Sequence, residues 1–217
     1  PFFVSSGKGA YLKDVDGNTY LDFSSGISAT NLGHCPPAIL KAIQKASKKF
    51  LHTCFLVAPY ESYLTLAEEL HKITPGKFPK KTFLGTTGAE AVENAIKIAR
   101  KYTGRTEIIS FKQGFHGRTL LALSLIAKEK TYKEGFGPFV AGIHQFEYPD
   151  KDESTNALFQ KLKKIDAKRV AAVIIEPVAG EGGFLVAQNR ALQGLQKFCR
   201  KNGIVFIVDE VQTGFCR

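Results

Sequence analysis

Apolar and polar positions alternate over residues 10–22, on both sides of an Asp16-Gly17 pair. An Asp-Gly pair between alternating segments is typical of a tight turn, so this segment predicts a β-hairpin. Further along, apolar residues recur three and four positions apart over residues 37–50 and again over 60–70, which is the spacing of an amphipathic helix. The first part of the chain is therefore predicted to form a β-ribbon followed by two helices.

The pattern changes after Pro75-Gly76, where short apolar runs rich in β-branched residues alternate with helical stretches. The runs predict strands at 82–84, 107–111, 170–175 and 204–208, and the stretches between them include helices at 90–102 and 189–202. The polar segment 148–156 is predicted to be a surface loop. Alternating strands and helices indicate an α/β fold with a mostly parallel sheet, in which ligands bind at the carboxyl ends of the strands.

Composition narrows the classes of function. The 217 residues are 44% hydrophobic, enough for a sizeable core, and carry a net charge of +10. The basic groups lie on amphipathic stretches, where they indicate solvated helix faces, so we expect no nucleic-acid partner. No apolar run is long enough to span a bilayer and no signal peptide is visible, so we expect a cytoplasmic protein without membrane contact. The four cysteines are far apart, and we expect neither a disulfide framework nor a bound metal.

Small residues follow the first predicted strand, in the segment Thr86-Thr87-Gly88-Ala89-Glu90. At the start of a helix, such residues let backbone N–H groups approach an anion such as a phosphate. The same pattern also describes an ordinary helix cap. The segment is a candidate phosphate site with a plain structural alternative.

Two further segments follow predicted strands. Phe115 and Arg118 come soon after the strand at 107–111, and a guanidinium there can bind both oxygens of a carboxylate. Glu176 and Glu181 follow the strand at 170–175, where a carboxylate could orient a cofactor or pair with an arginine. Taken one at a time, a core phenylalanine and a surface arginine are the better explanations of Phe115 and Arg118, and a polar turn explains Glu176 and Glu181 at least as well as a functional role.

Asp209 directly follows the predicted strand at 204–208. A partly buried carboxylate at this position needs a cationic partner, and a protonated pyridinium nitrogen is one such partner. A magnesium-binding acid of a nucleotide hydrolase is the competing interpretation. The chain has no GxxxxGK[ST] phosphate loop, so we set that interpretation aside.

Taken together and in order, these segments resemble one family. GTTGAEAVENAIKIAR (85–100), GFHGRT (114–119), IIEPVAGEGGF (174–184) and VDEVQTGF (208–215) are similar to the class III aminotransferases of fold type I, which depend on pyridoxal 5'-phosphate (PLP). DVDGNTYLDFSSGI (14–27), NLGHCPPAI (31–39) and HTCFLVAPYE (52–61) resemble the N-terminal region of the same family. The resemblance implies an N-terminal segment at 1–55, made of β-ribbon and helix, and a PLP-binding large domain at 56–217 that is incomplete at its C-terminal end.

The resemblance also implies how the cofactor would be held. The backbone of Gly88 and Ala89 would bind the PLP phosphate, and Phe115 and Val211 would lie on opposite faces of the pyridine ring. Asp209 would pair with the ring nitrogen.

Further residues complete the implied site. Gln212 would lie near the phenolic oxygen of PLP, Arg118 would bind a substrate carboxylate, and Ile27 would line the substrate pocket. Glu176 is implied in catalysis together with the aspartate. Glu181 is implied in substrate binding, as the partner of an arginine that would lie beyond this sequence.

The implied reaction is transamination from an ω-amino acid to 2-oxoglutarate. TTGAEAVENAIKIAR (86–100) and HTCF (52–55) most resemble the branch of the family that acts on 4-aminobutyrate, which would give succinate semialdehyde and glutamate. The partners would be a small amino donor and a 2-oxo acid, and the family implies a homodimer. Acetylornithine or ornithine as donor is one alternative, and a non-catalytic protein that keeps the fold is another.

Some features depart from the family pattern. Cys216 replaces the glycine usual after TGF, and the prolines usual soon after GEGG are missing. None of the lysines matches the motif of the family's Schiff-base lysine, which we expect beyond Arg217. We therefore expect the 217-residue chain by itself to be inactive as an aminotransferase.

Overall fold

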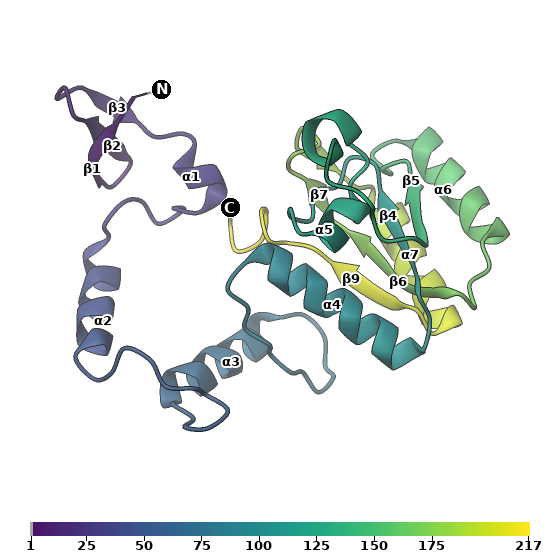
Figure 1. The fold of residues 1–217 in the computed structure, drawn as a ribbon, viewed down its shortest axis with the longest axis horizontal. Coiled ribbons are helices and arrows are strands. Elements are labelled where there is room, and N and C mark those ends of the chain that lie inside the picture. The colour runs from purple at the N-terminus through teal and green to yellow at the C-terminus, as the bar shows by residue number, and fades with distance from the viewer. Residues whose placement is uncertain (1) are drawn as a thin grey trace. The chain divides into compact units, whose positions relative to one another are not determined.

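The computed structural model describes residues 2–217 and divides them into two compact units (Figure 1). One unit extends to Leu84 and includes Arg217, and the other comprises Gly85–Cys216. The boundary predicted after residue 55 concerns the domains of the complete protein and stays a prediction.

The N-terminal unit begins with a three-stranded antiparallel sheet in the order β1-β2-β3, formed by Val4–Lys8, Tyr11–Asp14 and Thr19–Leu21. The predicted hairpin is thus confirmed. Its turn is held by the Asp14 carboxylate, which accepts the backbone N–H groups of Asp16 and Asn18 at 3.0 and 2.8 Å. Side-chain carboxylates that bond the backbone two residues on stabilise turns of this kind.

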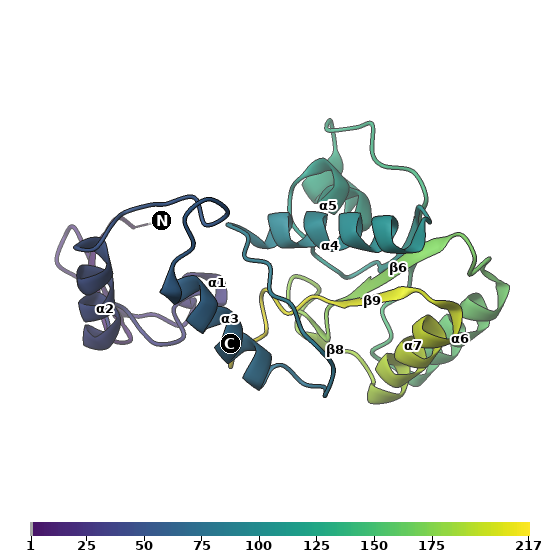
Figure 2. The same cartoon turned by 90° about the horizontal axis from the view of Figure 1, so that it is seen from below.

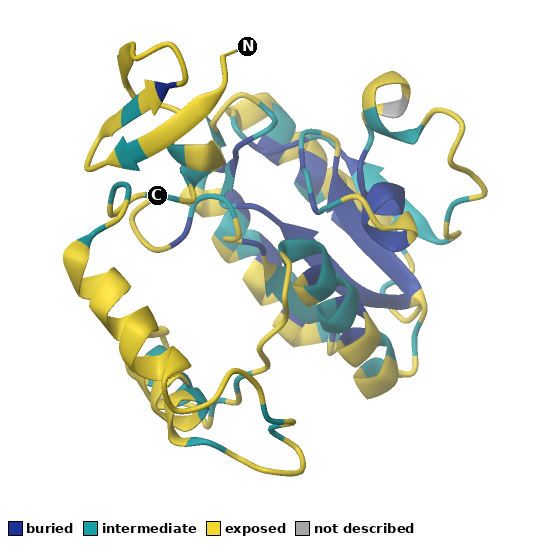
Figure 3. Cartoon of the chain, turned by 60° about the vertical axis from the view of Figure 1, so that its left-hand side comes forward, coloured by how far each residue is buried: buried dark blue, intermediate teal, exposed yellow. Residues whose placement is uncertain are grey.

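Three helices follow in the same unit: α1 (Ser25–Ser28), α2 (Pro37–Ser47) and α3 (Glu61–Ile73). The two predicted helices are confirmed as α2 and α3. Proline suits the first position of α2 because that position needs no N–H donor inside the helix. No residue of α2 or α3 is fully buried within the chain, and Figure 3 shows both helices mostly in the colour of exposed residues.

The second unit is built on a four-stranded parallel sheet in the order β5-β4-β6-β9. Its strands are β4 (Glu107–Phe111), β5 (Ile143–Phe146), β6 (Val170–Ile175) and β9 (Val205–Val208). Three of the four predicted strands are confirmed. The strand predicted at 82–84 is wrong, because that segment pairs with no described strand and Phe83 is 58% exposed. β5 was not predicted, since its sequence IHQF mixes polar and apolar residues.

Helices cover both faces of this sheet, with α4 (Gly88–Thr103) and α5 (Leu120–Leu125) on one face and α6 (Asp152–Lys164) and α7 (Asn189–Asn202) on the other (Figure 2). Successive strand residues alternate between the two layers. Ile108 and Ile174 pack towards α4 and α5, whereas Ile109 and Ile175 pack towards α6 and α7. Both faces are thus buried, as expected for a parallel sheet. The predicted α/β fold is confirmed.

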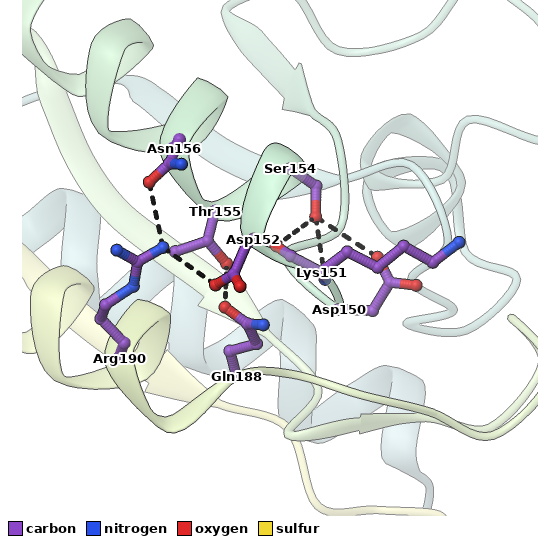
Figure 4. Close-up of polar contacts among 8 residues, drawn as sticks. All are labelled: Asp150, Lys151, Asp152, Ser154, Thr155, Asn156, Gln188 and Arg190. Atoms are coloured by element: carbon purple, nitrogen blue, oxygen red, sulfur yellow. Dashed lines mark hydrogen bonds and ion pairs between the residues drawn. The ribbon is translucent and has the colours of Figure 1, made fainter.

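Helix α6 begins inside the segment that was predicted to be a surface loop, so that prediction is wrong for residues 152–156 (Figure 4). The first turn of α6 is tied to the start of α7: Thr155 donates to the Gln188 side chain at 2.9 Å, and Arg190 donates to Asn156 at 3.0 Å. Tyr148, also in that segment, is 2% exposed. The polar residues of this segment suggested a surface loop, but several of their side chains form hydrogen bonds with the start of α7.

Short elements complete the unit: a π-helical turn η1 (Glu129–Lys133) and a two-stranded sheet of β7 (Val178–Ala179) and β8 (Leu185–Val186). All four cysteines are free, and burial raises the pKa of the Cys199 thiol to about 12. Within residues 2–217, no helix has the length and apolar character needed to cross a membrane, and no cluster of acidic, histidine and cysteine side chains could hold a metal ion.

Candidate active site

The carboxyl ends of β4, β6 and β9 and the N-terminus of α4 meet at one edge of the parallel sheet. The segment after β4 carries Phe115 and Arg118, Glu176 directly follows β6, and Asp209 directly follows β9. Helix α4 runs back along the sheet, so its first turn lies at the same edge. The topology thus gathers residues as far apart in the chain as Gly88 and Asp209, which are 121 positions apart.

The N-terminus of α4 keeps two backbone donors free. The Thr87 hydroxyl accepts the N–H of Glu90 at 3.1 Å, and the Glu90 carboxylate accepts the N–H of Thr86 at 2.6 Å. The N–H groups of Gly88 and Ala89 have no acceptor among the described residues. The capping interpretation of this segment therefore holds, and it leaves two donors at the positive end of a 16-residue helix for an anion.

Close backbone approaches join the segments of the site. A Cβ atom added at Gly88 would lie 2.6 Å from Cγ1 of Val211, and one added at Gly117 would lie 2.6 Å from Cβ of Ala89. A Cβ at Gly180 would overlap the side chain of Gln212. These glycines therefore let the loops after β4, β6 and β9 pack against one another and against α4.

Asp209 is 7% exposed and forms a buried pair with His116, whose Nδ1 lies 2.8 Å from Oδ2. The other carboxylate oxygen accepts the N–H of Val211 at 3.0 Å. A carboxylate only accepts, so Nδ1 of His116 carries the shared proton. Nε2 of His116 is buried without a hydrogen-bond partner in the described chain. This pair was missed by the sequence reasoning, which used the FHGRT motif without giving its histidine a role.

Glu176 is 3% exposed and binds the backbone of two loops. Oε1 accepts the N–H of Phe115 at 2.7 Å, and Oε2 accepts the N–H of Gly180 at 3.5 Å. Burial raises the pKa of Glu176 above its ordinary value, and the N–H of Phe115 acts in the opposite direction. Glu176 therefore fixes the position of Phe115 rather than contacting the free N–H groups of α4.

We expect the Glu176→Gln variant to reveal this raised pKa as a pH-dependent difference in stability. A carboxyl group whose pKa is raised in the folded state stabilises the fold fully below its ordinary pKa of 4.5, and this contribution is lost as pH rises through the folded value. The melting temperature of the wild-type full-length protein, relative to that of Glu176→Gln, should therefore fall between pH 4.5 and neutral pH. Glu134→Gln, at an exposed loop position, is the matched control. A difference that stays constant or grows with pH would contradict this assignment.

Arg118 and Glu181 both contact one aromatic side chain, Tyr132 of η1. The guanidinium carbon of Arg118 is 5.8 Å from the centre of the Tyr132 ring, and the Tyr132 hydroxyl donates to Oε2 of Glu181 at 3.1 Å. Arg118 is exposed and makes no ion pair with any acid in the described chain. It is thus a cation available to an anionic ligand. Tyr132 was also missed, because it comes from a loop that no motif marked.

The second unit thus brings together all but one of the predicted site residues. Ile27 lies in the N-terminal unit, where it is 72% exposed and has a φ of 57°. Its role in lining a substrate pocket stays a prediction, as do the roles of the other site residues towards a cofactor or substrate.

Comparison with known proteins identifies the same family as the sequence motifs. The family model described as aminotransferase class-III matches residues 1–217. A 4-aminobutyrate aminotransferase of Mycobacterium tuberculosis is 45% identical over all of this chain and 52% of its own length. The chain spans about half the length of the curated relatives it matches.

Solved structures are similar in fold. An adenosylmethionine-8-amino-7-oxononanoate aminotransferase of Methanocaldococcus jannaschii matches 99% of this chain and 50% of its own, with a TM-score of 0.92 and 35% identity. An ornithine aminotransferase of Toxoplasma gondii, with PLP at partial occupancy in its active site, matches 100% of this chain and 50% of its own, with a TM-score of 0.81 and 33% identity.

Proposed function

Because this chain belongs to the class-III aminotransferase family, we propose that the full-length protein transfers an amino group with PLP as cofactor. The donor is an ω-amino acid, 4-aminobutyrate in the first place, and the acceptor is 2-oxoglutarate. The products are succinate semialdehyde and glutamate. The assignment of the donor is supported by the 45% identity to a 4-aminobutyrate aminotransferase.

The observation that carries this proposal is the chain of contacts from Asp209 through Val211 to Gly88. It connects a buried carboxylate to two free N–H groups at a helix N-terminus. PLP has a ring nitrogen that can be cationic at one end and a phosphate at the other. The Asp209 carboxylate fits the first, and the two free N–H groups fit the second. The amides of Gly88 and Ala89 would bind the phosphate, and Asp209 would hold the proton on the ring nitrogen.

The other site residues of this chain orient the groups that would bind the cofactor and the substrate. Bound PLP supplies the electron sink that makes amino transfer possible. His116 donates to Asp209 and orients its carboxylate. Glu176 holds the backbone of Phe115, whose ring would lie against the cofactor. Val211, in the segment after β9, would pack on the other face of the cofactor ring. Arg118 binds the carboxylate of the substrate.

We also propose that the 217-residue chain by itself does not catalyse the reaction, since none of its lysines matches the family's cofactor lysine. The active protein is proposed to be a cytoplasmic homodimer that includes the rest of the family's length.

The experiment that tests the reaction is an absorbance measurement on the purified full-length protein with PLP. Addition of 4-aminobutyrate should shift the band of the bound cofactor, and 2-oxoglutarate should restore it. A response to acetylornithine or ornithine but not to 4-aminobutyrate would move the donor to that branch, and a response to 5-aminovalerate alone would indicate a pocket one methylene longer. A band that responds to no donor would favour the non-catalytic alternative.

The Arg118→Lys variant tests the substrate site. Lysine keeps the charge but loses the two parallel N–H groups that match a carboxylate, a loss of roughly 1.4 kcal/mol. We expect KM for 4-aminobutyrate to rise about tenfold in steady-state kinetics, with a smaller change in kcat. Arg200→Lys, at an exposed position of α7, is the matched control. An unchanged KM would remove Arg118 from the substrate site.

A further inference from the structure

Tyr148, a buried residue that follows β5, is bonded to both of the loops that carry site residues. Its ring packs edge-on against Phe111, the last residue of β4, with 6.3 Å between ring centres and 85° between the planes. Its backbone N–H donates to Oε1 of Gln113, in the loop after β4, at 3.3 Å. Its hydroxyl reaches the segment after β6. Tyr148 thus joins the loop of Phe115 to the segment that begins at Glu176.

The hydroxyl of Tyr148 lies among three carbonyl oxygens of the segment after β6. Those of Glu176, Pro177 and Leu185 are 2.8, 3.1 and 3.1 Å from it. A phenol has one proton to donate. The oxygen of Glu176 is the nearest and has no other donor among the described residues, whereas that of Pro177 also accepts the N–H of Ala187 at 2.9 Å. The proton is therefore assigned to the carbonyl of Glu176.

Glu176 connects this hydroxyl to the aromatic residue of the site. Its main-chain oxygen accepts the Tyr148 hydroxyl, and its Oε1 accepts the N–H of Phe115 at 2.7 Å. Burial raises the pKa of the Tyr148 hydroxyl, and the carboxylate of Glu176 acts in the same direction, so the hydroxyl is a donor at neutral pH. The two hydrogen bonds form a continuous path from Tyr148 to the backbone of Phe115.

Packing alone does not explain the hydroxyl of Tyr148. The ring belongs to the hydrophobic core between the sheet and helices α6 and α7. A phenylalanine would bury the same ring without the desolvation cost of a hydroxyl group. The bond to the main chain of Glu176 offsets that cost, so it is the feature that distinguishes tyrosine from phenylalanine at this position.

We propose that Tyr148 is a positioning residue: its hydroxyl fixes the main chain of Glu176, and the Glu176 carboxylate in turn fixes Phe115 for contact with the cofactor. The inference rests on the proposed function, since it takes the Phe115 ring as a group that lies on PLP. It adds to the site a residue of the core that no sequence motif contains.

The first test measures hydrogen exchange of the Phe115 amide in the PLP-free full-length protein, residue by residue. Tyr148→Phe removes the hydroxyl and keeps the ring packed on Phe111, so the variant is expected to fold. With the main chain of Glu176 released, the amide of Phe115 should exchange about two- to fivefold faster, as expected when a buried hydrogen bond that supports it is lost.

Thr155→Val is the matched control for this measurement. It also removes a fully buried hydroxyl of the same unit, which donates to Gln188 at 2.9 Å, and it keeps the shape of the side chain. It should leave exchange at Phe115 unchanged. An unchanged rate in Tyr148→Phe, or an equal rise in both variants, would overturn the inference.

The second test uses visible circular dichroism of the bound cofactor in the PLP-loaded full-length protein, which reports how the cofactor ring is held. Tyr148→Phe should reduce the band, and Thr155→Val should leave it unchanged. In a Phe115→Leu background, Tyr148→Phe should change the band no further, because no ring is left to position. A further change there would mean that Tyr148 acts on the cofactor by another route, and the inference would be wrong.

The two tests separate this inference from the proposed function, because the exchange rate needs no cofactor. If Phe115→Leu alone leaves the cofactor band unchanged, the proposed contact of Phe115 with PLP fails, and the role of Tyr148 towards the cofactor fails with it. If Phe115→Leu changes the band but Tyr148→Phe does not speed exchange at Phe115, the cofactor site stands and the positioning role is wrong. Thermal unfolding of each variant checks that it is folded.

Discussion

The Asp209→Asn variant of the full-length protein is expected to lose about 10²- to 10³-fold in kcat. The substitution keeps the shape of the side chain and removes its charge. The buried carboxylate accepts from His116 and from the N–H of Val211, and it is the group proposed to hold a proton on the cofactor nitrogen. An amide holds that proton far less well, and loss of one preorganised electrostatic partner in a buried site has an effect of this size.

Steady-state kinetics with saturating PLP measures the effect, and circular dichroism verifies the fold. Asp16→Asn is the matched control, because Asp16 lies exposed in the β2–β3 turn and Asn-Gly supports the same turn. A variant at position 209 that retained kcat within threefold would show that Asp209 is not the partner of the cofactor.

Gly117→Ala is expected to cost about 2–4 kcal/mol of stability and about 10²-fold in activity. Gly117 has a φ of +116°, which strains any other residue, and the added methyl group would lie 2.6 Å from Cβ of Ala89 and 2.9 Å from its Cα. Normal contact between carbon atoms is about 3.5–4.0 Å, so one of the two segments must move by about 1 Å. That movement would shift either the free N–H of Ala89 or the neighbouring Arg118.

Gly104→Ala separates strain from contact. Gly104 also has a positive φ, +69°, but nothing lies within 4 Å of an added Cβ. The Gly104→Ala variant should therefore lose only about 1–2 kcal/mol of free energy of unfolding and keep its activity. Thermal melts and kinetics on both variants provide the comparison. Equal activity losses at 104 and 117 would mean that the approach of Gly117 to Ala89 has no part in the site.

Much of the fold could be predicted from the sequence because its strongest patterns are local. The hairpin around Asp16-Gly17 and the helix at 189–202 have the expected bounds or nearly so, since turn chemistry and apolar spacing act over a few residues. The strands at 107–111 and 170–175 are buried on both faces. The second is a continuous apolar run, and the first is apolar except for Glu107 and Ser110.

The failures have physical causes. The start of α6 looks like a loop in sequence because its polar side chains bond to one another and to α7, which no local pattern reveals. The segment 82–84 has the composition of a strand but pairs with no described strand. In both segments, contacts with residues distant in the sequence determine the secondary structure.

The site was predicted in part. The motifs identified the residues that follow strands, and the sheet brings them to one edge. His116 and Tyr132 were missed because their importance comes from contacts with residues 93 and 49 positions away, respectively. A histidine next to a motif phenylalanine was a usable signal, whereas nothing in the sequence marked the tyrosine.

The unequal burial of the site residues has a consequence for how the protein can diversify. Glu176, Asp209 and His116 are almost completely buried and bonded to the backbone or to each other, so most substitutions there damage the fold itself. Arg118 is exposed and Tyr132 only half-buried, so changes there cost little stability. We therefore expect a change of preference for the amino donor to come from substitutions at less buried positions such as Arg118 and Tyr132. Glu176, Asp209 and His116 are expected to stay unchanged.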